Sequence, residues 1–201
     1  MMEEKRKAKL IGITGGIGSG KSSVARMIQE RGYPVFYSDD RAKNIVNEDL
    51  ILMQNIKNLL GEKAYQDGEY NRKYVADLVF NDSKLLEQLN HLIHPAVALD
   101  FENWTNAQDS EFIFKETALL FELGLNKDCF KSLLVTADDN TRIKRVMDRD
   151  GKTYREVEKV IEKQMSEREK IKKADFVIYN NSDFDDLAIA TNEFLEKLIS
   201  V

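Results

Sequence analysis

The sequence has little cysteine and proline and no long hydrophobic run. Its single cysteine, Cys129, excludes an intrachain disulfide and is typical of a reducing compartment, so we expect a cytoplasmic protein. No stretch approaches the roughly 18 consecutive apolar residues of a membrane-spanning helix. Residues 1–9 do not read as a signal peptide. These absences predict a protein that works without a membrane.

A strong positive charge is also missing. Thirty Lys and Arg residues stand against 35 Asp and Glu residues, which gives a net charge of −5. This balance argues against a general nucleic-acid-binding protein, because such proteins need a basic surface, but it leaves room for a local cationic pocket. With 201 residues, 42% of them hydrophobic, the chain predicts one globular domain with a small insertion, acting as a monomer or a weak homo-oligomer.

Short apolar runs alternate with helical patterns, which predicts an α/β fold with a five-stranded, mostly parallel sheet. The expected strands are residues 10–14, 34–37, 112–114, 133–135 and 176–179. Residues 50–106 interrupt the alternation and predict a helical insertion with a turn at Asp67-Gly68. The charged helical span 148–173 is either a solvated hairpin or a mobile lid.

The strongest motif follows the first expected strand and fits the phosphate-binding pattern G-x-x-x-x-G-K-[ST]. Glycines let successive backbone N–H groups surround phosphate oxygens, and the following helix directs its positive end at them. Lys21 can reach the β- and γ-phosphates of a nucleotide, and the Ser22 hydroxyl can bind Mg²⁺. The predicted nucleotide-binding residues of this loop are Gly16, Gly18, Ser19, Gly20, Lys21, Ser22 and Ser23.

This loop does not by itself distinguish a kinase from a nucleotide-dependent switch. A GTPase switch typically carries an Asn-Lys-x-Asp motif, whereas residues 126–129 read Asn-Lys-Asp-Cys, with the acid one position early. We therefore favour a small-molecule kinase, which needs an acid near the acceptor and cations around the transferred phosphoryl group. A kinase for nucleotides or nucleosides remains an alternative, and a switch is a further one.

Asp39 stands at the end of the second expected strand, where parallel sheets bind ligands. It could accept the proton of the acceptor or orient Mg²⁺, or it could simply cap the next helix. Arg142, Arg145 and Arg149 share one helix face, which is either solvated or a phosphate clamp. Arg168, further along, could join such a clamp.

The only histidines, His91 and His94, are three residues apart, but no third metal ligand is evident. The pair His94-Pro95 indicates either a bend between two helices or a contact with substrate.

Taken together, the motifs resemble those of the dephospho-CoA kinase family over nearly the whole chain. The matching segments are Thr-Gly-Gly-Ile-Gly-Ser-Gly-Lys at 14–21, the acid Asp39, Leu-Ile-His-Pro at 92–95, Leu-Leu-Phe-Glu at 119–122, and a C-terminal series from Lys144-Arg145 through Arg149-Asp150, Gln164 and Arg168 to Asn180-Asn181. One departure is Tyr37 in Tyr37-Ser38-Asp39, where the family often has Asp-Ala-Asp. Another is Glu116-Thr117-Ala118, which replaces an Asp-Val-Pro-like string, and Glu116 could hold Mg²⁺ through water.

The resemblance implies ATP- and Mg²⁺-dependent phosphorylation of the ribose 3′-hydroxyl of dephospho-coenzyme A. It implies a three-layer P-loop core (1–49, 107–147 and 174–201), a helical substrate domain (50–106) and a lid (148–173). The implied catalytic residues are Lys21, Asp39, Arg145 and Arg149. Asp39, His94 and Arg168 would bind substrate, Asn180 and Asn181 would lie near the adenine of ATP, and Ser22 and Asp39 would hold the metal.

Overall fold

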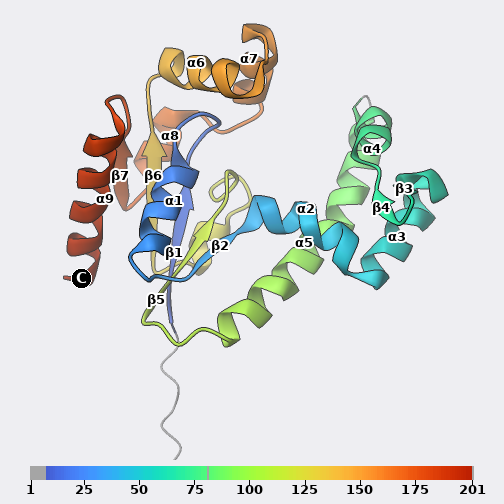
Figure 1. Cartoon of the computed structure of the whole chain (residues 1–201), viewed down its shortest axis with the longest axis horizontal. Helices are drawn as coiled ribbons and strands as arrows, with labels where there is room; N and C mark the ends of the chain where they lie inside the picture. Colours follow the sequence, from blue (N-terminus) through green and yellow to red (C-terminus); the bar gives the residue numbers. More distant parts are fainter. Residues whose placement is uncertain (1–7, 81, 201) are drawn as a thin grey trace, which may run out of the picture. The chain divides into compact units, whose positions relative to one another are not determined.

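The computed structural model describes residues 8–80 and 82–200, which form two compact units (Figure 1). Unit 1 comprises the described residues of Met1–Tyr37 and Gln108–Val201, and unit 2 those of Ser38–Ala107. Within these described ranges, no helix combines the length and the apolar character that crossing a membrane requires.

Unit 1 is built on a five-stranded parallel sheet with the strand order β2-β5-β1-β6-β7. Its strands are β1 (Lys9–Thr14), β2 (Val35–Tyr37), β5 (Phe112–Glu116), β6 (Lys131–Thr136) and β7 (Phe176–Tyr179). Its helices are α1 (Lys21–Glu30), the 3₁₀ helix η2 (Leu125–Asp128), α6 (Asp139–Asp150), α7 (Tyr154–Glu162), α8 (Glu167–Lys173) and α9 (Phe184–Ile199). The predicted α/β class and five-stranded parallel sheet are confirmed.

Alternating side chains of the central strand β1 serve the two faces of this sheet. Ile11 and Ile13 are fully buried in a core shared with α1 and α9. Gly12 points to the opposite face, where a Cβ atom would press against the side chains of Leu120 and Cys129. Both faces of the sheet are therefore covered, as its continuously apolar strands require.

Unit 2 is the connection between β2 and β5, which are parallel neighbours in the sheet. Its helices are α2 (Ser38–Glu48), α3 (Leu50–Leu60), the 3₁₀ helix η1 (Glu62–Ala64), α4 (Arg72–Val79) and α5 (Ser83–Asn106), with a hairpin of β3 (Tyr65–Gln66) and β4 (Glu69–Tyr70). The expected turn at Asp67-Gly68 joins the two hairpin strands, and both residues have positive φ angles.

Three helices of unit 2, α3, α4 and α5, follow residues that cap them with a side chain. Asp49 accepts hydrogen bonds from two backbone N–H groups of α3, Asn71 accepts one from α4 and Asp82 one from α5. Such caps satisfy N–H groups that have no partner inside a helix. The apolar faces of these helices then form a separate core around the buried side chains of Ile56 and Val75.

Helix α5 corrects one expectation from the sequence. His94-Pro95 does not separate two helices, because Pro95 lies inside the 24-residue helix α5. Proline removes one helical hydrogen bond and crowds the preceding turn, so a break was the reasonable prediction. The core of unit 2 holds α5 together across this position, because Leu92 and Ile93 before Pro95 and Val97 after it pack against the same cluster.

The charged span 148–173 is divided between three helices. Helix α6 ends at Asp150, where Gly151 adopts a left-handed conformation, with φ 65°. Helix α7 starts with a capping box in which Thr153 and Glu156 satisfy each other's N–H groups. Residues 163–166 then lead into α8. Movement of this segment as a lid stays a prediction.

Candidate active site

The phosphate-binding loop connects β1 to α1 in unit 1 (Figure 1). Gly18 and Gly20 have φ angles of 79° and 95°, in the region that only glycine enters freely. Helix α1 begins directly after Gly20 without a side-chain cap and with no acidic residue in its first turn. This arrangement is compatible with an anion at the positive end of the helix, and phosphate binding there stays a prediction.

The side chains of Lys21 and Ser22 meet a carboxylate at the end of β5. Lys21 Nζ lies 2.7 Å from Glu116 Oε1, and the Ser22 hydroxyl donates a hydrogen bond of 3.0 Å to the same oxygen. Glu116 is only 3% exposed. A buried carboxylate is stable here because it has a charged and a neutral donor. Parallel pairing of β5 with β1 explains the placement, since it aligns Glu116 with Ile13 near the start of the loop.

The side chain of Asn180 binds the backbone of the phosphate loop. Its Nδ2 donates to the backbone oxygen of Ser19 at 2.9 Å, and a Cβ atom at Gly20 would collide with that nitrogen. Arg145 in turn donates to the backbone and side-chain oxygens of Asn180, at 2.9 and 3.4 Å. Asn181 points elsewhere and accepts a hydrogen bond from the backbone N–H of Asp138. A place for Asn180 and Asn181 beside adenine stays a prediction.

The three arginines of α6 have three different surroundings. Arg142 is buried, and its Nε donates to the backbone oxygen of Ile17 at 3.1 Å. Arg145 is half-buried beside Asn180, whereas Arg149 is exposed and forms a two-pronged ion pair with Asp150, which raises the pKa of Arg149. The alternative of a solvated face is therefore wrong for Arg142, which is buried against protein groups, and phosphate binding by the three arginines stays a prediction.

The predicted residues outside the loop fall in both units. Asp39 is half-buried in unit 2 and is the second residue of helix α2, so it does not precede the helix. This position places its carboxylate favourably in the helix dipole, but it is not the N-cap that the sequence left open. His94 is exposed on α5 in the same unit, and Arg168 is exposed on α8 in unit 1.

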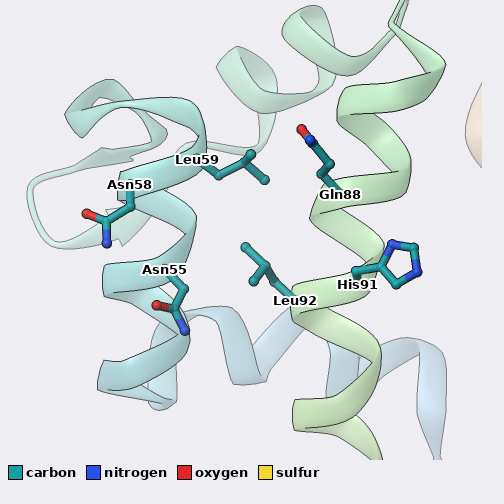
Figure 2. A pocket seen from close by; sticks show the side chains of 6 residues that line it. All are labelled: Asn55, Asn58, Leu59, Gln88, His91 and Leu92. Atoms are coloured by element: carbon teal, nitrogen blue, oxygen red, sulfur yellow. The ribbon is translucent and has the colours of Figure 1, made fainter.

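Unit 2 contains a hollow of about 530 Å³ between α3 and α5 (Figure 2). Its lining side chains are Asn55, Asn58 and Leu59 of α3 and Gln88, His91 and Leu92 of α5. Three carboxamides and two leucines suit a neutral ligand with both polar and apolar parts. The Nδ1 atom of His91 lies 2.9 Å from the backbone oxygen of Glu87, within its own helix.

Two contacts of the loop were not predicted from the sequence. Gln164, which follows α7, accepts a hydrogen bond of 3.0 Å from the backbone N–H of Ile17. Arg142 binds the oxygen of the same residue. Gln164 belonged to the family motif, so its presence was a signal, but nothing local indicated that it would contact the loop.

Comparison with known proteins identifies the family. The profile of the family described as dephospho-CoA kinase matches residues 9–186. A dephospho-CoA kinase of Fusobacterium nucleatum is 37% identical over 190 residues, covering 94% of this chain and 98% of that protein. A dephospho-CoA kinase of Porphyromonas gingivalis is 41% identical over 141 residues, 70% of each chain.

Solved structures agree on the fold. A crystal structure from Thermus thermophilus superimposes with a TM-score of 0.85 at 35% identity, covering 96% of this chain and 99% of that one. A shikimate kinase from Acinetobacter baumannii, at 12% identity and a TM-score of 0.56, shares the fold alone. Because the family profile spans most of the sequence and relatives match over nearly their full length, this chain belongs to the dephospho-CoA kinase family.

Proposed function

We propose that this chain transfers the γ-phosphoryl group of ATP to the ribose 3′-hydroxyl of dephospho-coenzyme A, giving coenzyme A and ADP. The observation that carries the proposal is an intact phosphate-binding loop, with Lys21 and Ser22 set against Glu116, in a member of the dephospho-CoA kinase family. Family membership supports the ATP-dependent chemistry, and the loop supplies the residues that perform it.

The loop binds the triphosphate through main-chain N–H groups and the start of α1. Lys21 moves from Glu116 to the β- and γ-phosphates, an exchange of one anionic partner for another. Gly16, Gly18, Ser19, Gly20 and Ser23 line the same loop. Asn180 holds the loop in shape through Ser19.

The residues around Ser22 fit Mg²⁺. This ion takes oxygen ligands, keeps several waters and needs one or two carboxylates from the protein. The Ser22 hydroxyl and the Glu116 carboxylate form such a pair of oxygen donors, 3.0 Å apart. Ser22 would hold the ion directly, Glu116 would hold it directly or through water, and Asp39 is the further predicted ligand. When bound, the ion neutralises charge on the β- and γ-phosphates.

Unit 2 receives the acceptor. Asp39 takes the proton of the 3′-hydroxyl or orients it toward the γ-phosphate. His94 is assigned to acceptor binding, and the hollow between α3 and α5 suits the neutral, amide-containing arm of dephospho-coenzyme A. The assignments of His94 and of the hollow follow the predicted role of residues 50–106 as the substrate domain, whereas Asp39 precedes that range and lies in unit 2.

Three arginines outside the phosphate loop act on the transferred group and the substrate. Arg145, beside the loop support Asn180, and Arg149 offset the charge that develops on the phosphoryl group, and Arg168 contributes to substrate binding. Arg149 would have to exchange Asp150 for phosphate, as Lys21 exchanges Glu116. Residues 148–173 act as the cover that keeps water from the reaction.

An acceptor panel tests the proposal. The protein is incubated with ATP and Mg²⁺ and with dephospho-coenzyme A, a set of nucleosides, a set of nucleoside monophosphates, or no acceptor. We expect ADP release to depend on dephospho-coenzyme A, with a product one phosphoryl group heavier at the 3′-position, and to be lost in Lys21→Met. Preference for a nucleoside or nucleotide would indicate the alternative kinase, and slow, acceptor-independent hydrolysis would indicate a switch.

A further inference from the structure

Ile17 at the tip of the phosphate loop is held by the segment that follows β6. Its backbone N–H donates to Gln164 Oε1 at 3.0 Å, and its backbone oxygen accepts from Arg142 Nε at 3.1 Å. Its side chain packs against an apolar cluster of α6 and α7, formed by Ile143, Val146, Val157 and Ile161. All three parts of this loop residue, the N–H, the oxygen and the side chain, are therefore bound by the α6–α7 region.

Arg142 has further partners that fix its guanidinium. The side chain is 2% exposed, and its Nη1 lies 3.2 Å from Glu167 Oε1 and 3.2 Å from Asp139 Oδ1. Glu167 opens α8 and also accepts a hydrogen bond from the hydroxyl of Thr136, at the end of β6. A buried guanidinium is tolerated because each of these contacts compensates for lost water. The loop tip, β6 and the start of α8 are thus joined through the ion pair of Arg142 and Glu167.

Gly16 makes the contact with the loop possible. A Cβ atom at this position would collide with Arg142 Nη2 and with Glu167 Oε1. The guanidinium–carboxylate pair therefore lies directly on the loop backbone, where a larger residue would displace it.

The arrangement bears on how nucleotide binding reaches helix α7. The N–H of Ile17 donates to Gln164, and the proposed ATP reaction assigns the phosphates to this same loop. Any shift of the Ile17 peptide when phosphates enter must change the bonds to Gln164 and Arg142, or move the helices that carry them. The converse holds as well, because coupling between two sites is reciprocal.

We propose that Ile17 couples occupation of the phosphate loop to the position of helix α7, with Arg142 and Gln164 as the positioning residues that transmit the coupling. The proposal rests on the proposed ATP reaction, because it takes the loop as the site of the triphosphate. It assigns a task to two side chains that contact the backbone of the loop at Ile17.

The test compares hydrogen–deuterium exchange of the α7 amides with and without a non-hydrolysable ATP analogue and Mg²⁺. Gln164→Met removes the acceptor oxygen at similar length, and Gln164→Glu keeps an acceptor. Arg142→Met removes the guanidinium. Lys144→Ala and Lys163→Met are exposed controls beside the two sites.

In the unaltered protein and in both controls, we expect the analogue to slow exchange in the loop and in α7. In Gln164→Met, the loop should still be protected but α7 should lose most of its nucleotide-dependent slowing, and KM for ATP should rise about 5-fold or more with a smaller change in kcat. Gln164→Glu should restore both. If Arg142→Met does not fold, the comparison of Gln164→Met with the unaltered protein is sufficient to decide the proposal.

Two results would overturn the coupling while leaving the ATP reaction intact. One is loop protection without any change in α7 in the unaltered protein, and the other is full slowing of α7 in Gln164→Met. No protection of the loop in the unaltered protein would instead contradict the proposed ATP reaction, and the coupling would fall with it.

Discussion

The ammonium of Lys21 lies 2.7 Å from the carboxylate of Glu116, the last residue of β5. Glu116 therefore forms an ion pair with the lysine that is predicted to bind the nucleotide phosphates. In the proposed reaction, the nucleotide must therefore compete with a buried carboxylate for this lysine. Bound Mg²⁺ would resolve the competition, because it offers Glu116 a new positive partner as Lys21 turns to the phosphates.

Replacing this carboxylate should show its effect in the metal requirement. We expect Glu116→Gln to lower kcat by about 10–100-fold and to raise the Mg²⁺ concentration needed for half-maximal rate, because an amide is a weaker ligand. Titration of activity with Mg²⁺ at saturating ATP measures this. Glu111→Gln, at an exposed site just before β5, is the control and should leave the titration unchanged. An unaltered Mg²⁺ dependence in Glu116→Gln would show that the Glu116 carboxylate does not help to bind the metal.

Asp39→Asn should separate turnover from nucleotide binding. Loss of a general base or orienting group costs about 10²–10⁴-fold in rate, while the proposed ATP site is the loop in unit 1. We expect that loss in ADP release, with the ATP dissociation constant measured by calorimetry within about 3-fold of the original. The neighbouring Asp40→Asn, which removes an exposed pair with Lys43, should keep normal turnover. Near-normal turnover in Asp39→Asn would show that its carboxylate is not required.

Arg149→Ala should impair catalysis with little effect on folding. The side chain is 65% exposed and its only described partner pair is with the adjacent Asp150, so the free energy of unfolding should change by no more than about 0.5 kcal/mol. Loss of a cation at the transition state should lower kcat about 100-fold. Lys144→Ala, on the same helix, is the matched control. A large fall in melting temperature with intact turnover would make Arg149 structural.

Cys129 should react slowly with alkylating reagents near neutral pH. Burial raises the pKa of its thiol to about 11, because desolvation disfavours the thiolate. Only about one molecule in a thousand would then carry the reactive thiolate at pH 8, and the rate should rise about tenfold per pH unit up to pH 10. Iodoacetamide labelling followed by mass spectrometry measures this rate. The urea-unfolded chain is the control, and equally fast labelling of folded and unfolded protein at pH 8 would contradict the shift.

The features that the sequence predicts well are local. The loop between β1 and α1 is one continuous motif, and alternation of apolar runs with helical patterns is enough to indicate a parallel sheet. The place of Lys21 and Ser22 at the start of α1 could be predicted for this reason, and their chemistry stays a prediction from the motif.

The features that the sequence did not predict join distant positions. Gln164 is 147 residues from Ile17, and Glu116 is 94 residues from Ser22, so no local pattern brings them together. Arg142 shows the same limit, since its spacing with Arg145 and Arg149 indicates a shared face but not that the first of them is buried. At Pro95 a valid local rule failed because packing in the core of unit 2 outweighed it.

Unit 2 also constrains how this protein can be redesigned. The chain leaves the sheet at the carboxyl end of β2 and must re-enter at the amino end of β5, since the two strands run in the same direction. A two-residue hairpin can join only antiparallel strands. Deleting residues 38–107 and sealing the gap with a tight turn would thus destroy the sheet, whereas a foreign segment of a dozen or more residues containing a helix could be grafted in their place.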